Sequence, residues 1–391
     1  MNFKKNGIPR IINGRKASFV RRKLVLFLLW QTFKTNWNPW KTFSEVKKIR
    51  KFRAELHGNP KILKFIKSDG KYFWAPENYG FPSKNLKSFI QLEFRRNSIT
   101  NYSDSGIIPQ QTIIWGITNR CMLSCKHCYD WYNIDVKDHL NIDQLKQILS
   151  KIEEQGIRHI QLSGGEPLAR FNDLISIISE ASQRVDFWLL TSGFGLTKEK
   201  AQELKSAGLK GVNISLDHWD EKAHNDFRNN SKSFEWVVKA VENCRNAGIM
   251  VSLSLCATRE FTTEENIQSY LNLAKKIGAH FVRILEPRQV GNFSTQNVKL
   301  NKDQVEMLSQ FTIQMNTNPD FKDFPIVVFF GYHQRKLGCM GAGNRYLYID
   351  SNGEFHACPF CQGSVGNALS KSFNDAIIQL RKNKCQAFKM Y

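Results

Sequence analysis

Short apolar runs alternate with segments of helical periodicity between about residues 110 and 290. The runs have the length of buried strands, and most end at glycine or polar residues. Several intervening segments carry helix boundary residues, such as Asn141 as an N-cap and a glycine after the last turn. The predicted strands are 112–117, 159–162, 187–190, 212–216, 250–255 and 281–285, and the predicted helices include 141–155, 197–207 and 233–247.

Repeated strand–helix units of about thirty residues predict an α/β fold with a parallel sheet, and six of them predict an open or partial (β/α)6 barrel. Ligands of such folds bind at the carboxyl ends of the strands. The residues that follow the first four predicted strands include Cys121, Gly164, Ser192 and Asp217. Their side chains are therefore expected at one edge of the sheet.

Three cysteines with C-x3-C-x2-C spacing, Cys121, Cys125 and Cys128, follow the first predicted strand. Three thiolates fill only three of the four iron positions of a [4Fe-4S] cluster, which leaves one iron open to an outside ligand. The next strand is followed by Gly164-Gly165-Glu166-Pro167. Two glycines at a strand end let the main chain approach a ligand closely, and a carboxylate suits an ammonium group. An ordinary strand-to-helix turn is the alternative interpretation of the glycines.

Together, the three cysteines and the Gly-Gly-Glu-Pro motif resemble the radical S-adenosylmethionine (SAM) superfamily. The resemblance implies a partial (β/α)6 barrel in which the open iron chelates the amino and carboxylate groups of SAM. It implies that Gly164, Gly165 and Glu166 hold the methionine amine and that the backbone at His127 approaches the adenine.

Residues 213–217 (Asn-Ile-Ser-Leu-Asp) resemble the subgroup with an auxiliary-cluster domain called SPASM or, in its shorter form, twitch. By this resemblance Ser215 lies near the methionine or ribose of SAM, and Asp217 faces SAM or the substrate. His218 stands where the subgroup usually has glycine. Alternatively, Asp217 caps the next helix and Arg228 is a solvated or salt-bridged surface residue.

A second cysteine group lies near the carboxyl terminus. Residues 350–353 (Asp-Ser-Asn-Gly) predict a hairpin turn, which would return Cys339 toward Cys358 and Cys361. By spacing alone this is also how a zinc ribbon is built. The spacing of Cys339, Gly353 and Cys358 resembles the auxiliary-cluster domain, which implies a closed [4Fe-4S] centre completed by Cys385.

The charge is concentrated in the first hundred residues, which contain 23 Lys and Arg against 5 Asp and Glu, whereas the remaining 291 contain 33 against 30. The apolar stretch 24–30 is too short to span a bilayer and leads into no signal cleavage site. We therefore expect a cytoplasmic protein, and basic residues beside Trp30, Trp37 and Trp40 favour peripheral contact with an anionic membrane. The alternatives are a helix packed on the open side of the barrel and a nucleic-acid surface; the latter is not expected, because no RNA-binding module is present.

Two of the nine cysteines remain. Cys244 shares a helix face with Val237 and Val241 and is interpreted as a core thiol. Cys256 ends the fifth strand and is interpreted either as core packing or as a hydrogen-atom donor to a substrate radical.

These observations predict three regions: a basic segment (1–105), a radical SAM barrel (106–300) and a twitch-like domain (301–391). The resemblance implies an enzyme that reductively cleaves SAM at its [4Fe-4S] cluster and abstracts a hydrogen atom from a peptide or a small or lipid-linked molecule. It also implies a reducing partner such as flavodoxin or ferredoxin. The alternative is a non-catalytic iron–sulfur carrier or membrane adaptor.

Overall fold

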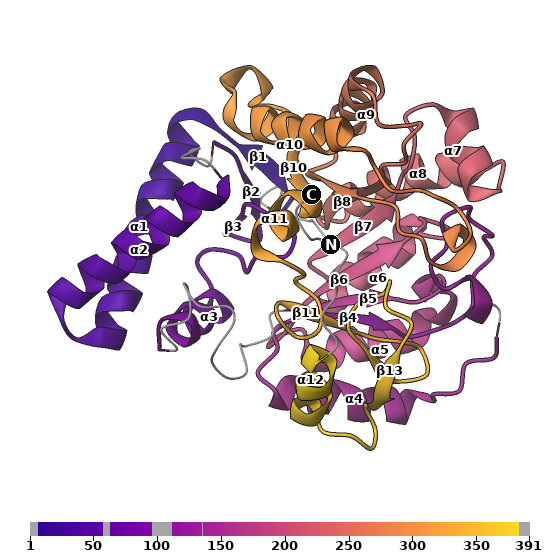
Figure 1. The fold of residues 1–391 in the computed structure, drawn as a ribbon, viewed down its shortest axis with the longest axis horizontal. Helices are drawn as coiled ribbons and strands as arrows, with labels where there is room; N and C mark the ends of the chain where they lie inside the picture. Colours follow the sequence, from indigo (N-terminus) through magenta and orange to yellow (C-terminus); the bar gives the residue numbers. More distant parts are fainter. Residues whose placement is uncertain (1–6, 58–62, 96–111, 135, 383–391) are drawn as a thin grey trace.

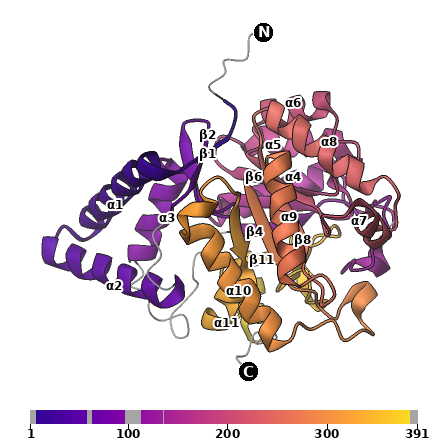
Figure 2. The same ribbon diagram turned by 90° about the horizontal axis from the view of Figure 1, so that it is seen from above.

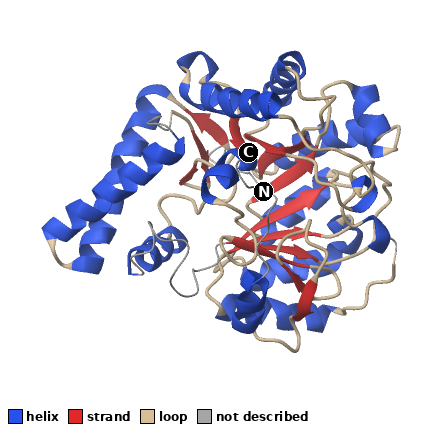
Figure 3. Cartoon of the chain, viewed as in Figure 1, coloured by secondary structure: helices blue, strands red, loops and turns tan. Residues whose placement is uncertain are grey.

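The structure is a computed structural model that describes residues 7–57, 63–95, 112–134 and 136–382. Its centre is a mixed sheet of ten strands in the order β10-β9-β8-β7-β6-β5-β4-β11-β12-β13 (Figures 1 and 3). The first eight strands in this order run parallel to their neighbours. Six strands correspond to the predicted ones: β4 (Thr112–Gly116), β5 (His159–Ser163), β6 (Asp186–Thr191), β7 (Gly211–Ser215), β8 (Met250–Cys256) and β9 (Phe281–Leu285). The edge strand next to β9 is β10 (Ile326–Phe329). All six predicted strands are confirmed, and β10 is a parallel strand of this sheet that the prediction missed.

Helices cover one face of this sheet, which we call the helix face. Alternate strand residues such as Ile113, Leu162 and Val212 pack there in one continuous core with the helices. The helices are α4 (Ile142–Glu154), α5 (Phe171–Ala181), α6 (Lys198–Ala207), α7 (Glu221–Arg228), α8 (Ser233–Asn246) and α9 (Glu264–Ile277). α10 (Lys302–Thr317) contributes to the same core and also lines the cavity described below, and α11 (Phe330–Leu337) lies at that cavity. The three helices predicted from sequence are α4, α6 and α8. Asn141 caps α4 through a reciprocal capping box with Gln144.

The carboxyl-terminal hairpin continues the same sheet. β11 (Tyr346–Ile349) pairs in parallel with β4, and β12 (Glu354–His356) and β13 (Ser364–Asn367) follow as antiparallel strands. α12 (Phe373–Lys382) packs its buried residues into the core of the helix face. The predicted hairpin is confirmed, and it is fused to the edge of the parallel strands by backbone hydrogen bonds.

The basic N-terminal region folds against the opposite face of the sheet, which we call the cavity face. Its elements are β1 (Arg10–Ile12), α1 (Gly14–Asn36), α2 (Pro39–His57), β2 (Phe65–Ser68), β3 (Lys71–Phe73) and α3 (Lys84–Arg95). Ile66 and Phe73 pack against Trp188, Phe281 and Ile326 near the amino ends of the central strands. Two views place α1 and α2 at one side of the molecule, apart from α4–α9 (Figures 1 and 2). No helix in the described part of the chain is long and apolar enough to cross a bilayer.

Candidate functional site

The loop after β4 carries the three cysteines and is fastened to the loop after β5. Gly165 N–H donates to the carbonyl of Thr118 (2.8 Å), and Glu166 N–H donates to the carbonyl of Arg120 (2.7 Å). A Cβ on Gly164 would lie 2.3 Å from the Thr118 oxygen, and one on Gly165 would lie 2.4 Å from the Arg120 oxygen. The two glycines therefore let the backbones of these loops touch, a constraint stronger than that of an ordinary turn.

A second loop, after β9, holds the cysteine loop from its other side. Asn292 donates from its backbone to the carbonyl of Cys128 (3.0 Å) and from its side chain to the carbonyl of Cys125 (2.9 Å). A Cβ on Gly291 would meet the Cys128 carbonyl oxygen at 2.0 Å. Sequence reasoning missed both residues, because the segment that contains them lies outside the predicted strands and helices.

Cys121, Cys125 and Cys128 line one cavity, and their surroundings suit a metal cluster. Burial raises the pKa of Cys121 to about 12 and that of Cys128 to about 11, so their thiolate forms require a neighbouring cation. The guanidinium of Arg228 donates to Cys125 Sγ at 3.5 Å. Iron would supply the missing positive charge at the other two thiols. The donor set therefore fits a three-cysteine cluster.

His127 lies between the second and third cysteines with its ring stacked on Phe227, at 4.8 Å between centroids. The Lys126 N–H donates to the carbonyl of Phe227 (3.0 Å), which fixes this turn of the loop against α7. Burial lowers the pKa of His127 to about 4, so its ring is neutral at neutral pH. His127 also lines the cavity, and its predicted position beside the adenine of SAM stays a prediction.

Glu166 is only 1% exposed and joins the loops after β5 and β6. Its carboxylate accepts hydrogen bonds from Thr191 Oγ1 (2.7 Å), from Ser192 N–H (2.8 Å) and Oγ (2.6 Å), and from Leu168 N–H (3.2 Å). Gly164, Gly165 and Ser192 line the cavity beside it. In this arrangement Glu166 positions Ser192, and its predicted contact with the SAM amine stays a prediction.

Asp217 and Arg228 form a buried ion pair at the carboxyl end of β7. Arg228 Nε lies 2.6 Å from Asp217 Oδ2, and the Cys256 N–H donates to Oδ1 (3.0 Å). Burial alone would raise the pKa of Asp217, but Arg228, the neighbouring imidazoles of His127 and His224, and the Cys256 N–H together hold the pKa below its ordinary value. Asp220, not Asp217, caps α7, and Arg228 is 7% exposed. The helix-cap and surface interpretations are therefore both wrong.

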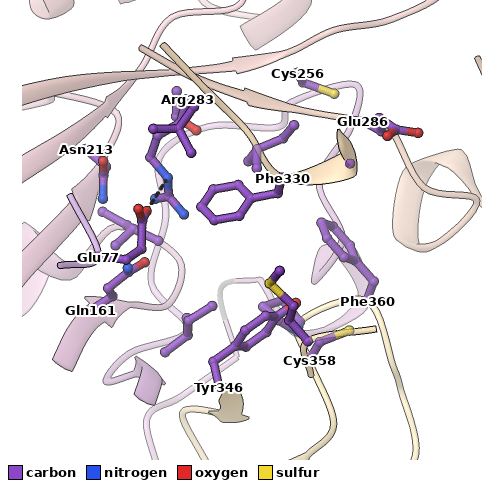
Figure 4. A pocket seen from close by; sticks show the side chains of 18 of the residues that line it. Glu77, Gln161, Asn213, Cys256, Arg283, Glu286, Phe330, Tyr346, Cys358 and Phe360 are labelled. Carbon is purple, nitrogen blue, oxygen red and sulfur yellow. Dashed lines mark ion pairs between the residues drawn. The ribbon is translucent and has the colours of Figure 1, made fainter. Parts of the chain in front are cut away.

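Ser215 and Cys256 line the same cavity, which has a volume of about 1270 Å³ and reaches from the sheet to the N-terminal region and the carboxyl-terminal hairpin. Figure 4 shows Cys256 and Glu286 on one side of this space, Tyr346, Cys358 and Phe360 on another, and Glu77 and Arg283 at its base. Cys244, in contrast, is fully buried in the core of the helix face, as predicted.

Three of the four carboxyl-terminal cysteines, Cys339, Cys358 and Cys361, line this cavity as well. Cys358 Sγ lies 3.4 Å from Cys361 Sγ, and the Ala342 N–H donates to the Ala357 carbonyl (2.7 Å), which draws the Cys339 segment toward the hairpin. Within the described ranges, no three His, Cys, Asp or Glu side chains are arranged to hold a single metal ion. Cys385 lies outside those ranges, and both the zinc and the cluster interpretations depend on it.

Comparison with known proteins places this site in a family. The model of the family described as "Radical SAM superfamily" matches residues 115–274. The chain is 32% identical over 195 residues to the GTP 3′,8-cyclase of Campylobacter fetus, covering 48% of this chain and 59% of the cyclase. It is 26% identical over 286 residues to the mycofactocin maturase MftC of Mycolicibacterium smegmatis, covering 68% of this chain and 69% of the maturase.

A similar fold occurs in Streptococcus suis SuiB bound to its precursor peptide SuiA, with a TM-score of 0.58, 14% identity, and coverage of 83% of this chain and 86% of SuiB. A structure of SuiB bound to SAM is also similar, with a TM-score of 0.53, 16% identity, and coverage of 75% of this chain and 69% of SuiB. The family match runs from the end of β4 through β8 into α9 and includes the cysteine loop, the Gly-Gly-Glu-Pro loop and the Asp217–Arg228 pair. The chain is thus an enzyme in which residues 115–274, the site included, match the radical SAM superfamily, and members of that superfamily bind a [4Fe-4S] cluster and SAM.

Proposed function

We propose that this protein abstracts a hydrogen atom from a peptide substrate held in the cavity, within a partial (β/α)6 barrel. The observation that carries the proposal is that Cys121, Cys125 and Cys128 open into the same 1270 Å³ cavity as the Gly164-Gly165 loop and the carboxyl-terminal cysteines. When bound, the cluster and SAM supply a 5′-deoxyadenosyl radical. The chain itself must place the substrate beside them and exclude water.

A peptide is the first candidate for the substrate. The cavity encloses about 1270 Å³ and must hold the cluster and SAM as well as the substrate, whereas pockets for small molecules usually enclose about 300–1,000 Å³. A peptide-bound structure of SuiB supports this choice. A small or lipid-linked molecule is the second candidate, supported by the similarity to a nucleotide cyclase.

His127, Ser192, Ser215 and Asp217 are proposed to border SAM, and Glu166 is proposed to reach its amine. Three of these residues are fixed by contacts already present: His127 by Phe227, Ser192 by Glu166, and Asp217 by Arg228. Such contacts hold the side chains in place before the cofactor arrives, which lowers the entropic cost of binding. The reductant is proposed to be a flavodoxin or ferredoxin in the cytoplasm.

The carboxyl-terminal cysteines are proposed to bind one auxiliary [4Fe-4S] cluster of the twitch type, with Cys385 as the fourth ligand. Metal analysis after anaerobic reconstitution tests this directly. About eight irons per chain support two clusters, and a Cys358→Ser variant should then keep about four. About four irons with one zinc would establish the zinc ribbon in its place.

Anaerobic cleavage of SAM by the reconstituted protein tests the enzyme proposal. With dithionite as reductant, we expect 5′-deoxyadenosine from the wild type and none from a Cys125→Ser variant. Cys244→Ala is a matched control, because this thiol is equally buried but faces the core of the helix face. No 5′-deoxyadenosine from the wild type, with its irons in place, would support the electron carrier instead.

Peripheral membrane contact is proposed for the hairpin of α1 and α2. Its exposed aromatic residues include Trp30 (53%), Trp37 (77%) and Trp40 (84%), and Lys34 Nζ lies 4.9 Å from the ring of Trp30. Tryptophan beside lysine or arginine suits the interface of an anionic bilayer.

Vesicle flotation tests this surface. A deletion of the first 60 residues is unsuitable, because it removes β1 and the part of α1 that lines the cavity. A variant with Trp37→Ser and Trp40→Ser should lose flotation with phosphatidylglycerol vesicles, whereas one with Trp131→Ser and Tyr132→Ser, which are exposed elsewhere, should keep it. Equal recovery of both variants with the vesicles would refute the contact.

A further inference from the structure

Four polar side chains from separate elements meet at the base of the cavity, below the rim that carries the cysteines. They are Gln161 of β5, Asn213 of β7, Arg283 of β9, and Glu77 of the N-terminal region, and we call them the polar floor (Figure 4). Each of the first three is a polar residue in the middle of its strand, with apolar neighbours on both sides, at a position that lines the cavity. Asn213 precedes Ser215 by two residues, so it lies one step closer to the amino ends of the strands.

Three amide atoms of the polar floor are buried without a hydrogen-bond partner. Asn213 is 1% exposed, and neither its Nδ2 nor its Oδ1 has a hydrogen-bond partner. Gln161 is 2% exposed, and its Oε1 is likewise unpartnered. Buried polar groups in folded proteins are almost always paired, since an unpaired group loses its hydration without compensation. These two amides therefore provide donor and acceptor atoms that suit a ligand.

The charges of the polar floor cancel. Glu77 Oε1 and Arg283 Nε form an ion pair at 3.1 Å without the geometry of a hydrogen bond, and the Arg283 guanidinium also lies over the ring of Phe330, at 5.1 Å from its centroid. Burial raises the pKa of Glu77 and Arg283 opposes this rise, as expected for a pair removed from water. A ligand with a net charge would have to break this pair, whereas a neutral ligand leaves it intact.

We infer that the polar floor binds a neutral amide group of the substrate, either a side-chain carboxamide or a peptide amide. A side-chain carboxamide would donate its two N–H groups to Asn213 Oδ1 and Gln161 Oε1, and a peptide amide would donate its single N–H to one of them. In both cases the carbonyl would accept from Asn213 Nδ2. An amide held there directs the rest of the substrate toward the carboxyl ends of the strands, where the three cysteines lie. This inference rests on the proposed function, because it assigns the substrate to the same cavity.

The test uses isosteric probes with the full-length, reconstituted protein in the presence of SAM. Benzamide (neutral), benzoate (anionic) and benzamidine (cationic) share one ring, and saturation-transfer NMR gives their dissociation constants. We expect benzamide to bind about tenfold more tightly than either charged probe. Tighter or equal binding of a charged probe would overturn the inference. Benzoate would then indicate an anion site at Arg283, and benzamidine would indicate a cation site at Glu77. N-methylbenzamide distinguishes a side-chain carboxamide from a peptide amide as the natural ligand group. Weaker binding of this secondary amide than of benzamide indicates a side-chain carboxamide.

Two variants connect the probe to the polar floor. Asn213→Leu should weaken benzamide binding about tenfold without lowering the melting temperature, because it removes polar atoms that lack partners. Leu190→Met, at the neighbouring position in register on β6, should bind benzamide as the wild type does. If Asn213→Leu fails to fold, Gln161→Met serves in its place.

Unchanged benzamide binding in the Asn213 and Gln161 variants would overturn the inference. Its failure and that of the proposed function can be distinguished. A wild type that forms 5′-deoxyadenosine but shows no preference for benzamide refutes only the amide site. A wild type that prefers benzamide but does not cleave SAM refutes the proposed function.

Discussion

Two buried histidines connect the N-terminal region to the sheet through hydrogen bonds, and acidification should weaken both connections. His280 Nδ1 accepts from Val251 N–H (3.0 Å), and its Nε2 lies 3.0 Å from the Pro9 carbonyl oxygen, to which it donates. His159 Nε2 lies 3.2 Å from the Pro76 carbonyl oxygen. Burial lowers the pKa of each histidine to about 4. Both are therefore neutral in the folded protein under conditions where an unfolded chain begins to bind protons.

The pKa values fix the sign and size of the effect. An unfolded histidine has a pKa near 6.5, so between pH 6.5 and 4 the unfolded state binds more protons than the folded state. The stability contributed by each neutral histidine is thus fully present above pH 6.5 and is lost as the pH falls toward 4. A pKa lowered from about 6.5 to about 4 corresponds to about 3 kcal/mol per histidine, of which about 2 kcal/mol is already lost at pH 5.

Urea unfolding of iron-free protein, followed by tryptophan fluorescence between pH 7.5 and 5, measures this loss. A His280→Gln variant should be less stable than the wild type above pH 6.5. Below pH 6.5 the difference in free energy of unfolding between the two should shrink by about 1.4 kcal/mol per pH unit. Lys205→Met is the matched control, because it removes a partly exposed ion pair with Asp69 (2.8 Å) that joins the same two regions without a histidine. The difference in free energy of unfolding between Lys205→Met and the wild type should stay constant over this pH range. A constant difference for His280→Gln as well would refute the reasoning.

Three further outcomes follow from the site. Gly165→Ala places a Cβ 2.4 Å from the Arg120 carbonyl oxygen, so we expect about a 100-fold loss of 5′-deoxyadenosine formation, whereas Gly363→Ala, with open space around it, should retain activity. Arg228→Leu leaves a buried carboxylate without its countercharge and should lower the free energy of unfolding by about 3–5 kcal/mol; Lys222→Met, in an exposed pair on the same helix, should leave urea midpoints nearly unchanged. Removing iron with a chelator should abolish SAM retention in equilibrium dialysis, and retention by iron-free protein would contradict the role of the open iron.

The strands and the cysteine loop could be predicted from sequence because their information is local. Apolar runs of strand length have few structural solutions, and the cysteines follow one such run directly. The hairpin of β11 and β12 was predictable for the same reason, since its turn residues are contiguous. The pairing of β11 with β4 was not, because it joins segments more than two hundred residues apart and leaves no local pattern.

The polar floor was missed although part of its pattern was present. Gln161, Asn213 and Arg283 are polar residues inside apolar strands, and strand periodicity places them opposite the helix face. Their meeting with Glu77 depends on how the N-terminal region folds over the sheet, which no periodicity specifies. The basic charge of that region suggested a surface role, but Ile66 and Phe73 also make it part of the interior.

The parallel register of β11 and β4 has a consequence for electron exchange. Cys121 follows β4, and the segments on either side of β11 and β12 carry Cys339, Cys358 and Cys361. The distance between the cysteine loop after β4 and the carboxyl-terminal cysteines is thus set by backbone hydrogen bonds within one sheet, and not by a docking contact between mobile lobes. An electron that passes between the two groups of cysteines should travel a fixed tunnelling distance. Substrate binding should therefore leave the rate of this electron transfer unaltered.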